Sequence, residues 1–148
     1  MFFLICSVLF FNIVAYFMPK KISRIELYTT SLFATVLQLT ADIILGFKYN
    51  LYWYFTKGVD SETFLIIFGL YPQVSMVFLN FFPYHRKLIL KISYIIGWSA
   101  FAIFYEWLIV KTNIFHYGGW KLWYSIPIYP ILYFILLLDL LFIRRIIK

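Results

Sequence analysis

Two carboxylates lie inside long apolar stretches of this chain, a position that is unfavourable for a charged group and needs an explanation. Asp42 and Glu106 each occur about four residues before the end of such a stretch. An acidic side chain in the middle of a membrane helix costs about 2.5–3.5 kcal/mol, so it needs protonation, a cation or a basic partner. A pair of such acids could bind a cation, share a proton, or meet an amine or a lipid headgroup.

Basic residues near the two acids leave a structural alternative open. Lys48 follows Asp42 by six residues, and Lys111 follows Glu106 by five. Either lysine could extend back along its helix toward the acid, and His116 is a further partner. A salt bridge of this kind, or shallow exposure to water, would explain both acids without a ligand.

Two glutamines are candidates to support the acids in binding a ligand. Gln38 precedes Asp42 by four residues, so the two share one face of a helix. Gln73 follows Pro72 in the next apolar stretch, where proline should kink the helix and could free a carbonyl for a ligand. We therefore predict a ligand site at Asp42, Glu106, Gln38 and Gln73. The alternative is that such polar groups only hold helices together.

The elements that must position these residues are membrane helices. The chain has 148 residues, of which 64% are hydrophobic and 13% charged, whereas a typical soluble domain is about 25% charged. A single all-α domain over 1–148 is predicted, built as an integral membrane bundle, because only helices satisfy their backbone within one segment in lipid. Five spans are expected near 2–18, 27–46, 63–82, 89–110 and 125–143.

Charge indicates how this bundle sits in a membrane. Nine basic residues fall on one set of connections: Lys20, Lys21, Arg24, Arg86, Lys87, Lys91, Arg144, Arg145 and Lys148. Four fall on the other set: Lys48, Lys57, Lys111 and Lys121. Because basic loops stay in the cytoplasm, we expect the N-terminus outside and the C-terminus inside.

The two connections on the side with fewer basic residues are aromatic. They read FKYNLYWYF over 47–55 and FHYGGWKLWY over 115–124. Rings of this type form interfacial belts, or they could cover an outward-facing pocket. Each connection follows one of the two acids and precedes a Tyr-Pro pair, Tyr71-Pro72 or Tyr129-Pro130. This order suggests a parallel repeat of two helices.

Familiar catalytic and cofactor motifs do not occur in the sequence. It lacks GxSxG, HExxH, P-loop and GxGxxG patterns, and Cys6 is its one cysteine. No catalytic residue, metal site or cofactor is therefore predicted. The net charge of +7 is explained by topology and not by nucleic-acid binding.

Three segments carry a resemblance to a known family. They are GFKYNLYWYFTKGVD, NFFPYHRKLILK and YEWLIVKTNIFHYGGWKLWYSIPIYP. They resemble an uncharacterised family of small multi-spanning proteins from spore-forming Gram-positive bacteria, which implies a multi-pass protein of the bacterial cell membrane. A more distant likeness is to membrane carotenoid cyclase domains, but their Pro-x-Glu-Glu motif is replaced here by IPIYP.

These observations lead to a non-enzymatic hypothesis with two alternatives. We expect a small membrane component that binds or passes a small polar or cationic solute, as a homo-oligomer or as an accessory subunit of a larger complex. One alternative is a membrane enzyme that acts on a lipid or isoprenoid, with Glu106 or Asp42 as general acid. The other is a structural subunit of a membrane complex.

Overall fold

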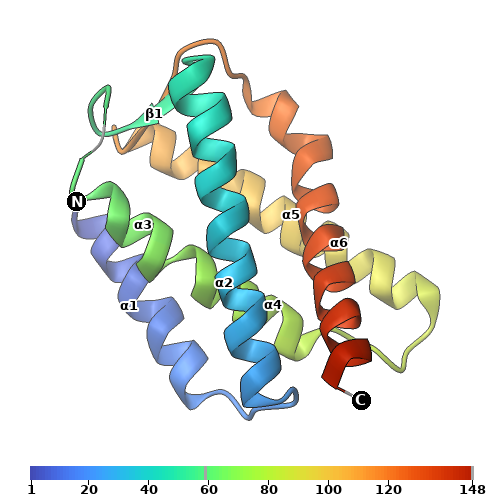
Figure 1. Cartoon of the computed structure of the whole chain (residues 1–148). Coiled ribbons are helices and arrows are strands. Elements are labelled where there is room, and N and C mark those ends of the chain that lie inside the picture. The colour runs from blue at the N-terminus through green and yellow to red at the C-terminus, as the bar shows by residue number, and fades with distance from the viewer. Residues whose placement is uncertain (59, 148) are drawn as a thin grey trace.

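The computed structural model describes residues 1–58 and 60–147, so Val59 and the basic Lys148 lie outside the described part. Helices dominate this part of the chain, and two short strands pair at one end of the bundle (Figure 1). The elements follow in this order: α1 (Phe2–Phe17), α2 (Arg24–Ala41), the π-helix η1 (Asp42–Lys48), β1 (Tyr52–Tyr54), α3 (Thr63–Gly69), α4 (Tyr71–Phe81), α5 (Leu88–Lys111), β2 (Phe115–Tyr117) and α6 (Leu122–Ile147).

Four helical stretches of the described residues are long and apolar enough to cross a membrane, by length and composition. They are Arg24–Lys48, Thr63–Phe81, Leu88–Lys111 and Leu122–Ile147. The stretch expected to span over 2–18 forms α1, which has 16 residues. At 1.5 Å per residue α1 is about 24 Å long, shorter than the roughly 30 Å of hydrocarbon in a bilayer.

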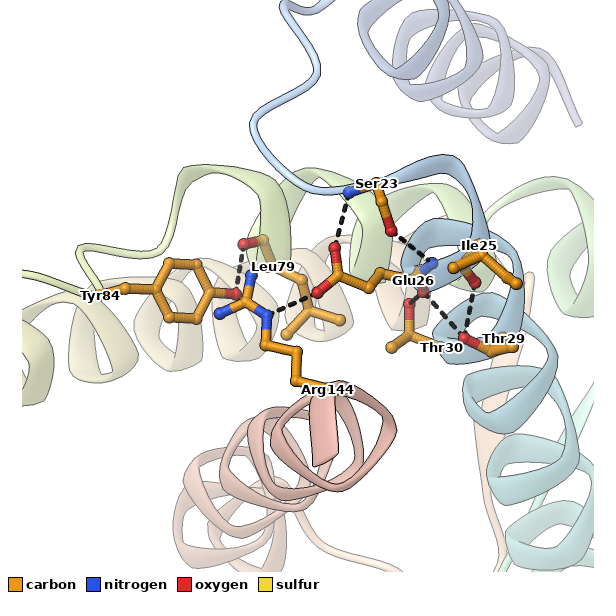
Figure 2. Close-up of polar contacts among 8 residues, drawn as sticks. All are labelled: Ser23, Ile25, Glu26, Thr29, Thr30, Leu79, Tyr84 and Arg144. Atoms are coloured by element: carbon orange, nitrogen blue, oxygen red, sulfur yellow. Dashed lines mark hydrogen bonds and ion pairs between the residues drawn. The ribbon is translucent and has the colours of Figure 1, made fainter. Parts of the chain in front are cut away.

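A polar cluster fixes the start of α2. The Ser23 hydroxyl accepts a hydrogen bond from the Glu26 amide, and the Glu26 carboxylate accepts one from the Ser23 amide, which together form a capping box. Arg144 Nε also donates to Glu26 Oε1 at 2.6 Å, and its guanidinium lies 4.5 Å from the centre of the Tyr84 ring (Figure 2). This Glu26–Arg144 cluster joins α2, α6 and the connection before α5.

The third apolar stretch is broken into α3 and α4 at Leu70, two residues before Pro72. Proline has no N–H to bond the carbonyl four residues earlier, so the expected kink is confirmed. At the break the Gly69 carbonyl accepts a hydrogen bond from Asn12 Nδ2 at 2.8 Å. This contact joins the break to α1.

The two aromatic connections form an antiparallel sheet, which we call the lid sheet (β1 and β2). Its register pairs Tyr52 with Tyr117, Trp53 with His116, and Tyr54 with Phe115. Alternate residues of a strand point to opposite faces. Tyr52, Tyr54 and Phe115 are buried against the bundle, while the rings of Trp53 and His116 stack at 5.8 Å. The helical prediction is confirmed, but these strands were not expected.

The helices do not all pack closely against one another, and α5 has close contacts with only part of the bundle. Helix α5 packs mainly against α6 and β2, whereas α2 packs against α4 and α6, and α1 packs against α4. Aromatic side chains fill much of the remaining space. Phe78 of α4 is fully buried, and its ring centre lies 4.4 Å from that of Tyr133 and 5.8 Å from that of Trp98. Toward the lid sheet this filling is incomplete, and a cavity remains.

Candidate functional site

A central cavity of about 200 Å³ lies inside the bundle, beneath the lid sheet. All six α-helices contribute to its wall, and most of that wall is aliphatic or aromatic. The following polar residues are among those that line it: Gln38, Tyr71, Tyr105, Glu106, Ser125 and Tyr129. The cavity therefore combines an apolar interior with one acidic group.

Glu106 is held in the wall of this cavity by three hydroxyl groups. Tyr117 and Ser125 donate to its Oε1 at 2.6 Å and 2.8 Å, and Tyr129 donates to its Oε2 at 2.7 Å. Trp120 Nε1 donates in turn to the Ser125 hydroxyl at 3.0 Å. Glu106 is only 4% exposed, so these donors replace the water that a buried carboxylate would otherwise lack.

The elements around Glu106 explain why these hydroxyls converge. Glu106 lies in the last two turns of α5, just before the chain leaves the helix to form β2. The β2 strand returns Tyr117 over the end of α5. Ser125 and Tyr129 are four residues apart in α6 and therefore lie on the same helical face. Helix α6 begins at Leu122, earlier than the predicted residue 125, so Pro127 and Pro130 lie inside the helix.

Asp42 has a different set of partners. Tyr52 donates to its Oδ1 at 2.8 Å, and Gln38 Nε2 donates to the same atom at 2.9 Å. The Gln38 contact confirms the predicted four-residue spacing on one helical face. Asp42 is 7% exposed, and its Oδ2 is buried with no hydrogen-bond partner in the described residues.

A second cavity of about 260 Å³ lies beside the first, between η1, the lid sheet and the start of α3. Asp42 lines this second cavity, whereas Glu106 lines the central one. Tyr52 and Tyr54 line both cavities and form the wall between them. We had expected the two acids to face one another. They line different cavities instead, because the lid sheet inserts the Tyr52 and Tyr54 rings between them.

Polar contacts nevertheless cross the wall between the cavities. Gln38 Nε2 lies 3.3 Å from the Tyr54 hydroxyl, which lies 3.1 Å from the Tyr71 hydroxyl. The contacts run from Asp42 through Gln38 and Tyr54 to Tyr71, whose side chain lines the central cavity. Neighbouring hydrogen bonds of this kind polarise one another.

The expected basic partners lie elsewhere. Lys48 Nζ lies over the Tyr49 ring at 5.3 Å, and Lys111 Nζ lies over the Trp107 ring at 3.8 Å. His116 stacks on Trp53. The Glu26–Arg144 contact is the one ion pair in the part of the chain that the structure describes. Tyrosine, serine and glutamine donors, and not lysines, therefore compensate the two acids.

Gln73 is the predicted site residue that the structure does not bring to the others. It lines neither cavity, and its Oε1 is buried without a hydrogen-bond partner among the described residues. Tyr71, two residues earlier, faces the central cavity instead. Tyr117, Ser125 and Tyr129 bond Glu106, although their sequence pattern did not mark them as site residues.

The lid tyrosines remain neutral hydrogen-bond donors. Burial, followed by the charge of Asp42, raises the pKa of Tyr52 well above its ordinary value of 10.0. Burial and then the hydrogen bond to Glu106 raise the pKa of Tyr117 in the same direction. Burial, the neighbouring Tyr71 and Asp42 raise the pKa of Tyr54. Each hydroxyl therefore keeps its proton for donation at physiological pH.

The donor set offers little to a metal ion. No group of three or more His, Cys, Asp or Glu side chains that could hold a metal occurs in the described residues. A carboxylate beside several aromatic rings is instead suited to an organic cation, which gains from both charge pairing and ring faces. Comparisons of the chain with protein-family models, curated proteins and solved structures find no match.

Proposed function

We propose that the chain is a multi-pass protein of the bacterial cell membrane whose central cavity binds a small organic cation with an apolar body. The observation that carries the proposal is Glu106, which is buried beside an apolar cavity with no cationic partner among the described residues. An acidic residue at this depth is otherwise costly, so its default interpretation is functional.

The proposed topology has five spans, with the N-terminus outside. The lid sheet and η1 lie at one end of the bundle, and the α1–α2 connection and the C-terminus lie toward the other (Figure 1). The lid end carries Lys48, Lys57, Lys111 and Lys121, and the nine remaining basic residues of the sequence belong to the other connections. The positive-inside rule then assigns the lid sheet to the outer surface. Helix α1 would span with local thinning of the bilayer.

A parallel repeat of two units fits the contacts at the lid end. Asn50 and Asn113 each precede a strand by two residues and each adopt a left-handed conformation, with φ of 50° and 56°. The antiparallel register relates the strands by a local two-fold axis through the pair Trp53 and His116. A repeat of this kind would place one acid, one strand and one Tyr-Pro pair in each half.

The character of the cavity specifies the ligand class. The apolar wall favours a hydrocarbon body, while Glu106 and the rings of Tyr71, Tyr129 and Trp120 favour a positively charged end. Hydroxyls that donate to a carboxylate keep oxygen lone pairs free, so they can also accept from an ammonium group.

Binding of hexylammonium to protein in lipid nanodiscs tests the proposal, with hexanol as the uncharged control. Titration calorimetry should show saturable binding of hexylammonium at least tenfold tighter than that of hexanol. Glu106→Gln should remove this preference for the amine. Glu62→Gln is the matched control, because Glu62 lines neither cavity. Equal binding of both compounds, or unchanged preference in Glu106→Gln, would refute the proposal.

The apolar wall also favours one alternative, a membrane enzyme that acts on a lipid or isoprenoid with Glu106 as general acid. This alternative predicts that Glu106→Gln changes the lipid profile of the bacterial host. It also predicts no preference for hexylammonium over hexanol. Lipid extracts of cells that express each variant therefore separate the two functions.

A further inference from the structure

The second cavity contains a buried carboxylate oxygen that the fold leaves without a partner. Asp42 Oδ1 accepts from Tyr52 and Gln38, but Oδ2 is buried and accepts no hydrogen bond from the described residues. Buried polar atoms are nearly always paired, so an exception of this kind calls for an explanation. Asp42 lines the second cavity, so its carboxylate lies beside that space.

The walls of the second cavity suit a cation. Phe47, Trp53, Tyr54 and Phe64 contribute aromatic rings to it. Lys57 Nζ already lies over the Trp53 ring, 4.7 Å from its centre, so this ring face accepts an ammonium group.

A second acid, Asp60, also lines this cavity. Its carboxylate accepts two hydrogen bonds from Thr56, at 2.6 Å and 2.9 Å. The Thr56 side chain, followed by its amide, lowers the pKa of Asp60, which therefore stays ionised. The lining carries two acids and one lysine, and the lysine forms no ion pair with either acid.

The backbone at Asp42 also has an uncommon form. Asp42 is the first residue of η1, and its amide is shared between the carbonyls of Gln38 and Leu39. π-Helical segments are rare and often occur at functional sites, because the wider turn displaces a side chain from the regular helical face. Here the switch from α2 to η1 coincides with the carboxylate that lacks a partner.

We infer that the second cavity is a separate binding site for a small primary ammonium ion, with Asp42 Oδ2 as its counter-ion. The ammonium group would donate to Oδ2, and its carbon atoms would contact the rings of Phe47, Trp53 and Phe64. A metal cation would need several oxygen ligands, whereas aromatic rings make up much of this wall. The site does not depend on the ligand of the central cavity, since Glu106 lines only that cavity.

Titration of nanodisc-embedded protein with ethylammonium chloride tests the inference. The wild type should bind ethylammonium saturably, and Asp42→Asn should weaken binding at least tenfold. Trp53→Leu gives a second test that leaves the carboxylate in place, and it should weaken binding several-fold. Glu62→Gln is the matched control, because Glu62 lines neither cavity, and it should bind ethylammonium as the wild type does. Circular dichroism and thermal unfolding check that each variant is folded.

Each alternative outcome contradicts the inference in a distinct way. Absence of saturable binding, or binding unchanged in both Asp42→Asn and Trp53→Leu, removes the site. Equal competition by sodium ions assigns the cavity to metal cations and overturns the ammonium assignment. Loss of ethylammonium binding in Glu106→Gln alone moves the ligand to the central cavity, which leaves the proposed function intact and refutes this second site.

Discussion

Tyr52 and Tyr117 pair across the lid sheet, and the hydroxyl of each donates a hydrogen bond to a different buried acid. Tyr52 bonds Asp42 at 2.8 Å, and Tyr117 bonds Glu106 at 2.6 Å. One cross-strand pair therefore connects the lid to both carboxylates, one beside each cavity. The lid sheet is held down by these hydroxyls as well as by apolar burial.

Removing either hydroxyl should destabilise the protein. Tyr52→Phe and Tyr117→Phe should each lower the free energy of unfolding by about 1–2 kcal/mol, since a hydrogen bond to a charged group is lost. Unfolding in mixed micelles, followed by circular dichroism, measures the change. Tyr28→Phe is the control, because Tyr28 is 65% exposed and should have no effect. Unchanged stability in both lid variants would contradict these contacts.

The turn after β2 should not tolerate a side chain at Gly118. A Cβ there would collide with the Asn50 carbonyl oxygen and lie 2.9 Å from Trp53 Cζ3. The Gly118, Gly119 and Trp120 amides all donate to the Leu51 carbonyl, so the turn has little freedom to move. Gly118→Ala should cost about 1–3 kcal/mol of stability.

Gly97→Ala is the matched control for Gly118→Ala. No atom lies within 4 Å of a Cβ built at Gly97, which lies inside α5. This change should raise stability by about 0.5–1 kcal/mol. Thermal unfolding of the two variants in nanodiscs gives the comparison, and a Gly118→Ala variant as stable as Gly97→Ala would refute the close approach.

The lid tyrosines predict a loss of stability at alkaline pH. The pKa values of Tyr52, Tyr54 and Tyr117 are raised above the ordinary 10.0 in the folded state. Their contribution is therefore complete below pH 10.0 and is lost as the pH rises from there toward the folded-state values. Thermal unfolding midpoints measured on both sides of pH 10 should decrease as the pH rises above 10. The fall should be shallower in Tyr54→Phe than in the Tyr28→Phe control.

The Glu26–Arg144 ion pair should stabilise the opposite end of the bundle. The two side chains are 11% and 30% exposed, so solvent screens the pair only in part. Glu26→Gln and Arg144→Gln should each cost about 1–3 kcal/mol, and a double-mutant cycle should show coupling between them. Arg145→Gln is the control, because Arg145 is exposed and forms no ion pair. Additive effects would mean that the pair contributes nothing.

The proposed orientation can be measured by cysteine labelling. In a Cys6→Ser background, Ser61→Cys should react with a membrane-impermeant maleimide in intact cells. Lys87→Cys should react only after lysis. Both positions are exposed, so the difference reports the side of the membrane and not burial. The reverse pattern would place the lid sheet in the cytoplasm.

The helices and part of the site were predictable, because they depend on local sequence. Apolar runs located the helical stretches, the four-residue spacing put Gln38 beside Asp42, and Pro72 marked the break in the third stretch. The lid sheet was not predictable, since strands of three residues are too short to show alternation. Pairing between distant loops also leaves no local signal.

The hydroxyl donors and Gln73 show a second limit. Tyr117, Ser125 and Tyr129 reach Glu106 only because β2 and α6 return over the end of α5. Gln73 was predicted from its place beside Pro72. The break at Leu70 is where that proline led us to expect it, but the direction of the Gln73 side chain depends on how α4 packs, which the local sequence does not show.

Because the lid sheet joins two distant parts of the chain, the ribosome releases β1 long before its partner strand exists. Until β2 arrives, the nascent protein exposes the unpaired edge of β1. A polypeptide that stops before α6 would also carry Glu106 without two of its three donors. Truncated products should therefore be recognised and degraded by membrane proteases, which makes the C-terminal helix the checkpoint of biogenesis.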